Sequence, residues 1–162
     1  MYRSIISAVA VVLGAVWIAM PQSPPGAIRF SHRPIPFTLE SCETSEKHAP
    51  ETMAGGVAVF DFDNDGFLDI FFANGADIRS LKKTGPKYRN RLFKNDGKAN
   101  FTDVTDRAGL AGTGYDNGIA IGDYDNDGRL DLVVTNFEGE SSTFFGNLGG
   151  GMFADRTSAA GL

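Results

Sequence analysis

The chain has 162 residues, 42% hydrophobic and 22% charged, so it is long enough for one domain with a hydrophobic core. Its formal net charge of -5 argues against nucleic acid as the main partner, and its single cysteine, Cys42, excludes an internal disulfide. The 20 glycines mostly separate short apolar runs, which is typical of strands joined by tight turns.

Residues 1–20 contain one basic residue, Arg3, followed by an apolar run from Ile5 to Met20. This pattern is typical of a secretory signal and predicts an exported protein that is periplasmic, secreted or held at the cell surface. No clear small-x-small cleavage site follows the run, so a cleaved signal peptide and an uncleaved signal anchor both remain open. A buried structural helix is the alternative. We expect contact with a membrane only through this segment, if it is uncleaved.

Residues 21–36 hold five of the seven prolines and are predicted to form an extended linker. Residues 37–55 form an N-terminal segment in which 37–39 are a candidate outer strand that would close a ring of blades. His48, next to Pro50 and Glu51, is interpreted as a residue that stabilises a turn rather than as a ligand or a catalytic group.

The rest of the chain repeats itself. GVAVFDFDNDGFLDIFFAN at 56–74 aligns without a gap with GIAIGDYDNDGRLDLVVTN at 118–136, and FKNDGKANFTDVTDRAGL at 93–110 aligns with FGNLGGGMFADRTSAAGL at 145–162. Residues 56–110 and 111–162 are therefore predicted to be two repeats of four short strands each. The predicted class is all-β, with two four-stranded blades of a partial β-propeller, and an eight-stranded β-sandwich is the alternative. The recurring phenylalanines are expected to pack between the blades: Phe71, Phe72, Phe93, Phe101, Phe144, Phe145 and Phe153.

The first repeat carries an additional basic segment between Asn74 and Leu92. A loop that grips an anionic polysaccharide or lipid headgroups is one interpretation. We favour the interpretation that the segment is a solvent-exposed loop between two strands. Its basic residues are Arg79, Lys82, Lys83, Lys87, Arg89 and Arg91.

Two nonapeptides, DFDNDGFLD at 61–69 and DYDNDGRLD at 123–131, each place four aspartates in nine positions. Two unit charges about 5 Å apart repel by roughly 3 kcal/mol at an effective dielectric near 20, so the arrangement is unfavourable unless a cation lies among the carboxylates. All the donors are oxygen, which suits calcium and disfavours zinc or copper. The sequence therefore predicts two Ca²⁺ sites. Their ligands would be Asp61, Asp63, Asp65, Asp69 and the Phe67 carbonyl in the first, and Asp123, Asp125, Asp127, Asp131 and the Arg129 carbonyl in the second.

Three other interpretations of the nonapeptides fit the sequence less well. An EF-hand requires a glutamate at its twelfth position, where Phe72 and Val134 stand, and helices rather than strand-like flanks. A solvated acidic turn without metal does not explain two copies in the same register. Paired carboxylates serve glycoside hydrolysis, but a general acid needs a carboxyl that stays protonated, and these four are clustered for joint ionisation.

Together, these motifs resemble the FG-GAP/VCBS-repeat propellers, whose calcium loops are known from integrin α-subunits. More narrowly, HAPETMAGGVAVFDFDNDGFLDIFFANG at 48–75, NRLFKNDGKANFTDVTDRAGL at 90–110 and GYDNGIAIGDYDNDG at 114–128 resemble bacterial proteins similar to cartilage acidic protein, which often carry an ASPIC/UnbV domain. The resemblance covers roughly residues 37–162. It implies an exported, calcium-stabilised propeller whose loops bind or adhere, and it supplies no enzymatic residue. Such propellers are expected to have about seven blades, so a fragment of a longer chain is expected, with assembly from several copies as the alternative.

The function predicted from the sequence is therefore an exported calcium-binding propeller module that serves binding or adhesion and not catalysis. Its partner would be an extracellular protein or polysaccharide, and the missing blades would come from a longer chain or from other copies. The alternative is part of a calcium-stabilised lyase or hydrolase acting on extracellular polysaccharide. For that chemistry, His48 and the basic segment are the candidate groups.

Overall fold

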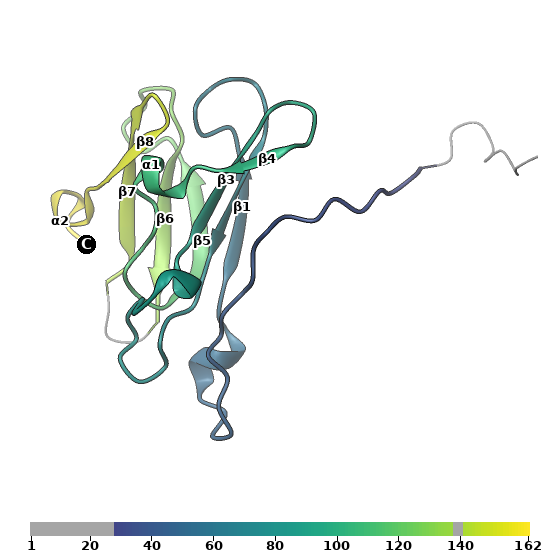
Figure 1. The fold of residues 1–162 in the computed structure, drawn as a ribbon. Coiled ribbons are helices and arrows are strands. Elements are labelled where there is room, and N and C mark those ends of the chain that lie inside the picture. The colour runs from purple at the N-terminus through teal and green to yellow at the C-terminus, as the bar shows by residue number, and fades with distance from the viewer. Residues whose placement is uncertain (1–27, 138–140) are drawn as a thin grey trace, which may run out of the picture. The chain divides into compact units, whose positions relative to one another are not determined.

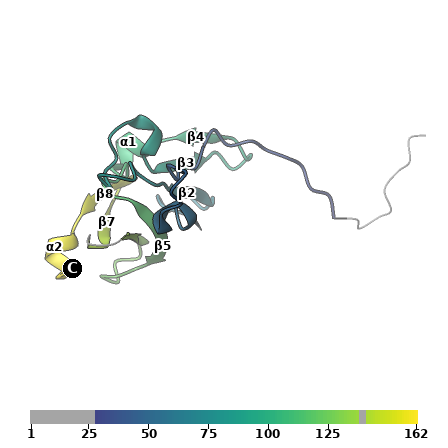
Figure 2. The same ribbon diagram turned by 90° about the horizontal axis from the view of Figure 1, so that it is seen from below.

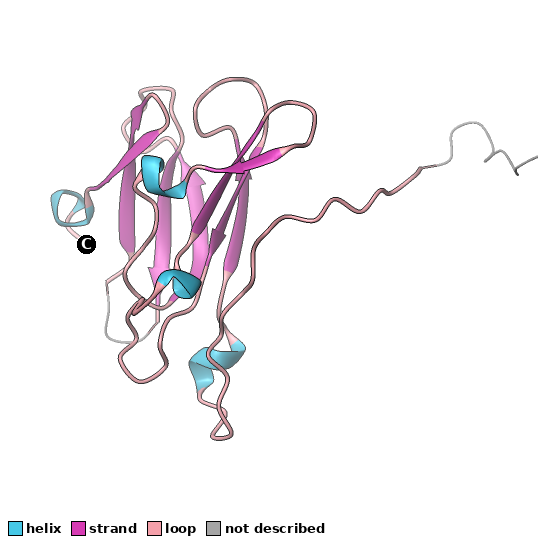
Figure 3. Ribbon diagram, in the orientation of Figure 1, coloured by secondary structure: helices cyan, strands magenta, loops and turns pink. Residues whose placement is uncertain are grey.

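A computed structural model describes residues 28–137 and 141–162, so the predicted signal at 1–20 and the first part of the linker lie outside the described residues. The chain divides into one unit of residues 1–32 and a second unit of residues 33–162, and all that follows concerns the second unit. Figure 3 shows that this unit consists mainly of strands and loops, with only short helices. The strands are β1 (Gly56–Phe60), β2 (Asp69–Ala73), β3 (Arg91–Asn95), β4 (Phe101–Asp103), β5 (Asp116–Gly122), β6 (Asp131–Asn136), β7 (Thr143–Gly149) and β8 (Met152–Asp155). The helices are η1 (Ala49–Thr52), η2 (Pro86–Tyr88), α1 (Thr105–Ala108) and α2 (Thr157–Ala160).

The eight strands form two antiparallel sheets, each a meander in chain order: β1-β2-β3-β4 and β5-β6-β7-β8. This arrangement confirms the predicted repeats of four strands and is consistent with two propeller blades. In the first sheet Gly56 pairs with Ala73 and Phe60 with Asp69, and in the second Gly122 pairs with Asp131. Each acidic nonapeptide therefore connects the first two strands of its sheet and lies at the same end of its hairpin.

The two sheets pack together along their first strands. β1 and β5 lie side by side, as Figure 1 shows, and a Cβ at Gly56 would lie 3.3 Å from the Cα of Gly118. In both views α1 lies beside β8, whereas α2 lies on the outer side of the second sheet (Figure 1, Figure 2). The core between the sheets takes apolar residues from both of them: Ala58, Phe60, Phe62, Phe71, Ala73, Leu92, Ala108, Leu110, Leu132, Val134, Phe145 and Phe153.

The seven phenylalanines expected between the blades fall into two groups. Five are buried: Phe71, Phe93, Phe144, Phe145 and Phe153. Phe72 and Phe101 are only half-buried. Phe60 and Phe62, which lie outside this predicted set, are also buried, at 2% and 3% exposed, and Phe62 stacks on Phe153 of the other sheet with ring centroids 6.5 Å apart.

The N-terminal segment is tied to the sheets without joining them. Residues 37–39 lie outside every strand of the structure. The ring of Phe37 stacks on Phe72 with centroids 4.4 Å apart, and the Tyr115 hydroxyl lies 2.9 Å from the carbonyl oxygens of both Ser41 and Pro50. Burial raises the pKa of Tyr115 to about 12, so this hydroxyl remains a donor at neutral pH. That residues 37–39 close a ring of blades remains a prediction.

The basic segment is held against the protein by ion pairs. Lys83 reaches the interior, where its Nζ lies 3.3 Å from Asp116 and donates to the carbonyls of Asn74, Gly75 and Tyr88. Three further pairs are Lys87 with Glu40, Arg89 with Asp106, and Arg91 with Asp103. At least four of the six basic side chains are therefore matched by carboxylates of the chain itself.

His48 precedes η1, and its backbone N–H donates to the Glu51 carboxylate at 3.1 Å. Its ring lies 2.8 Å from Glu46, so its contacts agree with the predicted turn-stabilising role. Among residues 28–137 and 141–162, no helix has the length and apolar character that a membrane span requires.

Candidate metal centre

The two acidic loops adopt the same backbone conformation. The fourth position, Asn64 or Asn126, has φ of 57° or 58°, and the sixth, Gly66 or Gly128, has φ of 87° or 82°. Positive φ is disfavoured for residues with a Cβ, asparagine less so than most, and is readily adopted by glycine. The Asn-Asp-Gly core of each nonapeptide thus produces the tight bend that turns the surrounding carboxylates inward.

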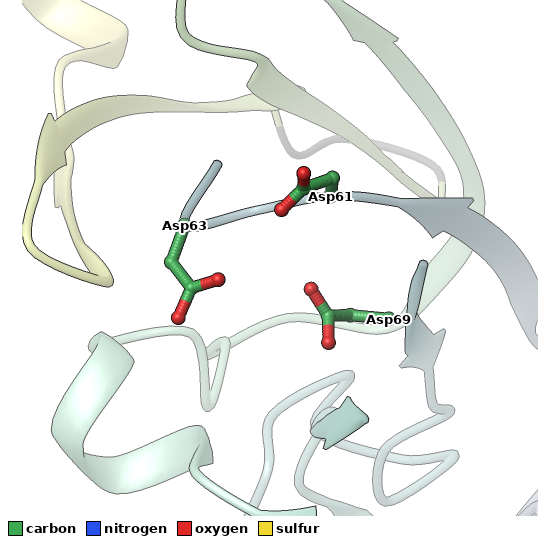
Figure 4. Close-up of side chains that lie close together, drawn as sticks. All are labelled: Asp61, Asp63 and Asp69. Atoms are coloured by element: carbon green, nitrogen blue, oxygen red, sulfur yellow. The ribbon is translucent and has the colours of Figure 1, made fainter. Parts of the chain in front are cut away.

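In the first loop the carboxylates of Asp61, Asp63 and Asp69 converge. One oxygen from each lies within 4.8 Å of the others, and Figure 4 shows the three groups facing a common centre. Calcium binds oxygen at about 2.3–2.6 Å, so ligand oxygens on opposite sides of one ion are roughly 5 Å apart. The spacing of the first triad therefore suits a single calcium ion.

Backbone N–H groups hold two of these carboxylates in place. Asp61 accepts from Asp65 at 3.0 Å and from Gly66 at 2.7 Å. The buried Asp69 accepts from Phe62 at 3.2 Å and from Asn95 of β3 at 2.8 Å. An ionised carboxylate has about four acceptor sites, so both groups keep acceptor capacity for a cation.

The second loop repeats this arrangement. Asp123, Asp125 and Asp131 form a triad within the same limit of 4.8 Å. Asp131 is 5% exposed and accepts from Tyr124 at 2.9 Å and from Asn147 at 2.8 Å, which are the counterparts of the Phe62 and Asn95 bonds to Asp69. Asp123 and Asp125 are exposed, whereas Asp61 and Asp63 are half-buried.

The fifth position of each loop lies outside its triad. Asp65 pairs with Lys94 of β3 at 2.7 Å, and Asp127 pairs with the Arg129 guanidinium. The N–H groups of Phe67 and Arg129 donate to these same aspartates, each at 2.9 Å. That Asp65, Asp127 and the carbonyls of Phe67 and Arg129 complete the two coordination shells remains a prediction.

The electrostatics of the first site follow from burial and from Lys94. Burial raises the pKa of Asp69, with Asp63 and Asp65 adding to the rise, while the N–H groups of Asn95 and Phe62 oppose it. The hydrogen bond from Lys94 lowers the pKa of Asp65, and the carboxylates of Asp63 and Asp65 raise the pKa of Lys94. A cation in the triad would favour the ionised form of Asp69, for which burial alone is unfavourable.

The residues present fit a hard divalent cation. The donors are all carboxylate oxygens, and one of them, Asp63 Oδ1, is buried without a hydrogen-bond partner among the described residues. A buried acceptor without a partner costs about 1–3 kcal/mol, which coordination to a metal would offset.

Two residues of the site were not found from the sequence. Lys94 and Asn147 stand in the aligned FKN and FGN segments, but nothing in those segments indicates contact with the acidic loops. The Asn147 side-chain amide donates to Phe62 of the first loop at 2.9 Å and to Leu130 of the second loop at 3.0 Å. Asn64 also links the loops, since its amide donates to the Gly128 carbonyl at 3.1 Å.

The sequence is similar to a known repeat family and to a known protein. Residues 61–134, which include both acidic loops, match the family model of the FG-GAP-like repeat. The chain is also 30% identical over 90 residues to cartilage acidic protein 1 of Xenopus tropicalis, an alignment that covers 55% of this chain and 12% of that protein. The resemblance drawn from the motifs is thereby confirmed: the chain contains FG-GAP-like repeat sequence and is distantly similar to cartilage acidic protein 1.

Proposed function

We propose that the chain is an exported calcium-binding module of β-propeller blades that serves binding or adhesion rather than catalysis. The observation that carries the proposal is the pair of aspartate triads, placed identically in two loops that each join the first two strands of a sheet. The two sheets would be two blades of a larger ring, completed by further blades of a longer chain or of other copies.

Calcium would neutralise the carboxylates of each loop and bridge the two strands that the loop connects. In the first site Asp61 lies just after β1, Asp63 within the loop, and Asp69 at the start of β2. Asp65 and the Phe67 carbonyl would complete the shell. Because the triad exists only in the folded hairpin, binding energy stabilises the fold.

The surroundings of the second triad support a binding role. A cavity of about 380 Å³ lies beside it, in the size range of small-ligand sites. Asp125 and Asp131 of the triad line it, together with Tyr124, Phe144 and Arg156. Tyr124 is 69% exposed, and its ring lies tilted against that of Phe144 with centroids 5.0 Å apart, so an aromatic surface is open to a partner next to the metal loop. The proposed partner is an extracellular protein or polysaccharide.

No contact in the described residues favours the alternative of a polysaccharide lyase or hydrolase. His48 pairs with Glu46, and four basic side chains of the insertion pair with carboxylates. His48 and these four side chains, which are among the candidates for that chemistry, are therefore engaged in contacts within the chain.

The proposed location outside the cytosol rests on the sequence of residues 1–20. Extracellular calcium modules have dissociation constants of about 0.1–1 mM, and such sites stay filled at millimolar calcium. The location and the metal chemistry are therefore mutually consistent.

Equilibrium dialysis against ⁴⁵Ca²⁺ tests the metal assignment. We expect the wild-type chain to bind two calcium ions, and both Asp61→Asn and Asp123→Asn to bind one. An Asp77→Asn variant, which removes a carboxylate outside both loops, is the control and should still bind two. Wild-type stoichiometry in either loop variant, or no binding by the wild type, would contradict the proposal.

A further inference from the structure

The two acidic loops differ in one respect that their sequences do not reveal. In the first, the Lys94 ammonium donates to Asp63 Oδ2 of the triad and to Asp65 Oδ2. Lys94 comes from the middle of β3, where it pairs with Thr102 of β4, and its side chain is 32% exposed. Its Nζ lies 5.7 Å from the centre of the Phe62 ring, so the side chain lies across the loop.

The equivalent position in the second sheet is Gly146. It lies in the middle of β7 and pairs with Ala154 of β8, as Lys94 pairs with Thr102. A glycine brings no ammonium to the second triad. Arg156 passes beside Gly146, but among the described residues it forms no ion pair with Asp123, Asp125 or Asp131. The cation of the second loop, Arg129, pairs with Asp127, the counterpart of Asp65 and a proposed ligand outside the triad. Lys94 differs from Arg129 because it also pairs with a carboxylate of the triad itself, Asp63.

We propose that Lys94 is a built-in competitor for the cation at the first site, so that the two sites differ in affinity and the first is the weaker. The inference rests on the proposed calcium binding and concerns which residue tunes it. Without calcium, the ammonium offsets the repulsion between Asp63 and Asp65. When calcium is bound, the same ammonium is a like charge at contact range, and it must swing away from Asp63 before that carboxylate can coordinate fully.

This role makes two opposite predictions for one substitution. Lys94→Met keeps much of the apolar stem and removes the charge. In calcium-free buffer the variant should melt at a lower temperature than the wild type, because the carboxylates lose their partner. In calcium titrations it should bind more tightly at the first site, by about tenfold, within the range of typical coupling between two ligands. If Lys94 only supported the fold, its substitution would lower both the melting temperature without calcium and the calcium affinity of the first site.

Isothermal titration calorimetry with calcium alone assigns the effect to a site. In the Asp123→Asn background only the first site remains, and Lys94→Met should increase its affinity. In the Asp61→Asn background only the second site remains, and the same substitution should leave its affinity unchanged, which also shows that the variant is folded. Lys94→Arg keeps a cation and should keep the weak affinity. Lys98→Met, an exposed lysine on the same hairpin, controls for the loss of a positive charge.

Unchanged or weaker affinity of Lys94→Met at the first site would overturn the inference while leaving calcium binding in place. Equal tightening at both sites would also overturn it, since the effect would then come from net charge. If the wild type binds no calcium at all, the proposed function fails and the role of Lys94 fails with it.

Discussion

At the scale of single residues, spacing alone predicted that four aspartates of each loop converge, and three of the four form a triad, whereas Asp65 and Asp127 lie outside it. Positions one, three and nine of each nonapeptide meet in a triad because the Asn-Asp-Gly bend reverses the chain between them. The partners of these carboxylates could not be predicted in the same way. Lys94 and Asn147 are distant in sequence from the loops that they contact, and only the packing of strands and sheets brings them there.

Asn147 and Asn95 show how aligned residues acquire different roles. Both donate an N–H to the buried aspartate of their own loop and an amide hydrogen to a leucine carbonyl there. Only Asn147 also reaches the other sheet, at the Phe62 carbonyl, and it is 5% exposed.

Asn147→Ala should therefore destabilise the protein more than Asn95→Ala. It leaves buried carbonyls of Phe62 and Leu130 without donors, at a cost of about 1–3 kcal/mol. Asn95→Ala removes two exposed side-chain hydrogen bonds, one to the Leu68 carbonyl and one from the Gly97 N–H, and should cost about 1 kcal/mol or less. Urea unfolding at saturating calcium measures both. If both variants lose the same free energy of unfolding, the hydrogen bond from the Asn147 amide to the Phe62 carbonyl does not stabilise the contact between the sheets.

At the scale of elements, the repeat predicted the two four-stranded meanders, because each motif recurs with its flanking strands in the same order. The basic segment was less predictable. Its composition indicated a solvated loop, whereas Lys83 lies inside the protein with 3% of its side chain exposed. Lysines are rarely buried, and charge composition alone does not reveal which one finds a buried carboxylate.

The Lys83–Asp116 pair should be the main anchor of this segment. Burial lowers the pKa of Lys83, and Asp116 partly offsets this effect. Lys83→Met leaves Asp116 as a buried charge without its lysine. The substitution should lower the free energy of unfolding by about 3–5 kcal/mol, measured by chemical denaturation. Lys98→Met, at an exposed lysine outside this segment, should cost little stability, and combining Lys83→Met with Asp116→Asn should recover part of the stability lost in Lys83→Met. A Lys83→Met variant as stable as the wild type would show that the pair does not anchor the segment.

At the scale of the whole molecule, the structure places two blade-like sheets side by side, with both acidic loops at one end and linked to each other. The Asn64–Gly128 hydrogen bond joins the loops, and Phe62 packs on Phe153 across the sheets. The sequence predicted the repeats and their class. The contact between them could not be predicted, because it depends on which apolar face of each strand turns toward the other sheet. The ring and its partner are proposals that follow from this pair of sheets.

The most direct test of the account is a thermal melt of the chain, monitored by circular dichroism, in millimolar calcium and again with a chelator. Because the triads form only in the folded hairpins, the account predicts one cooperative transition that calcium moves to higher temperature. Asp61→Asn combined with Asp123→Asn should abolish the shift. A cooperative wild-type transition at the same temperature in both buffers would contradict the central claim that these loops are calcium sites coupled to the fold.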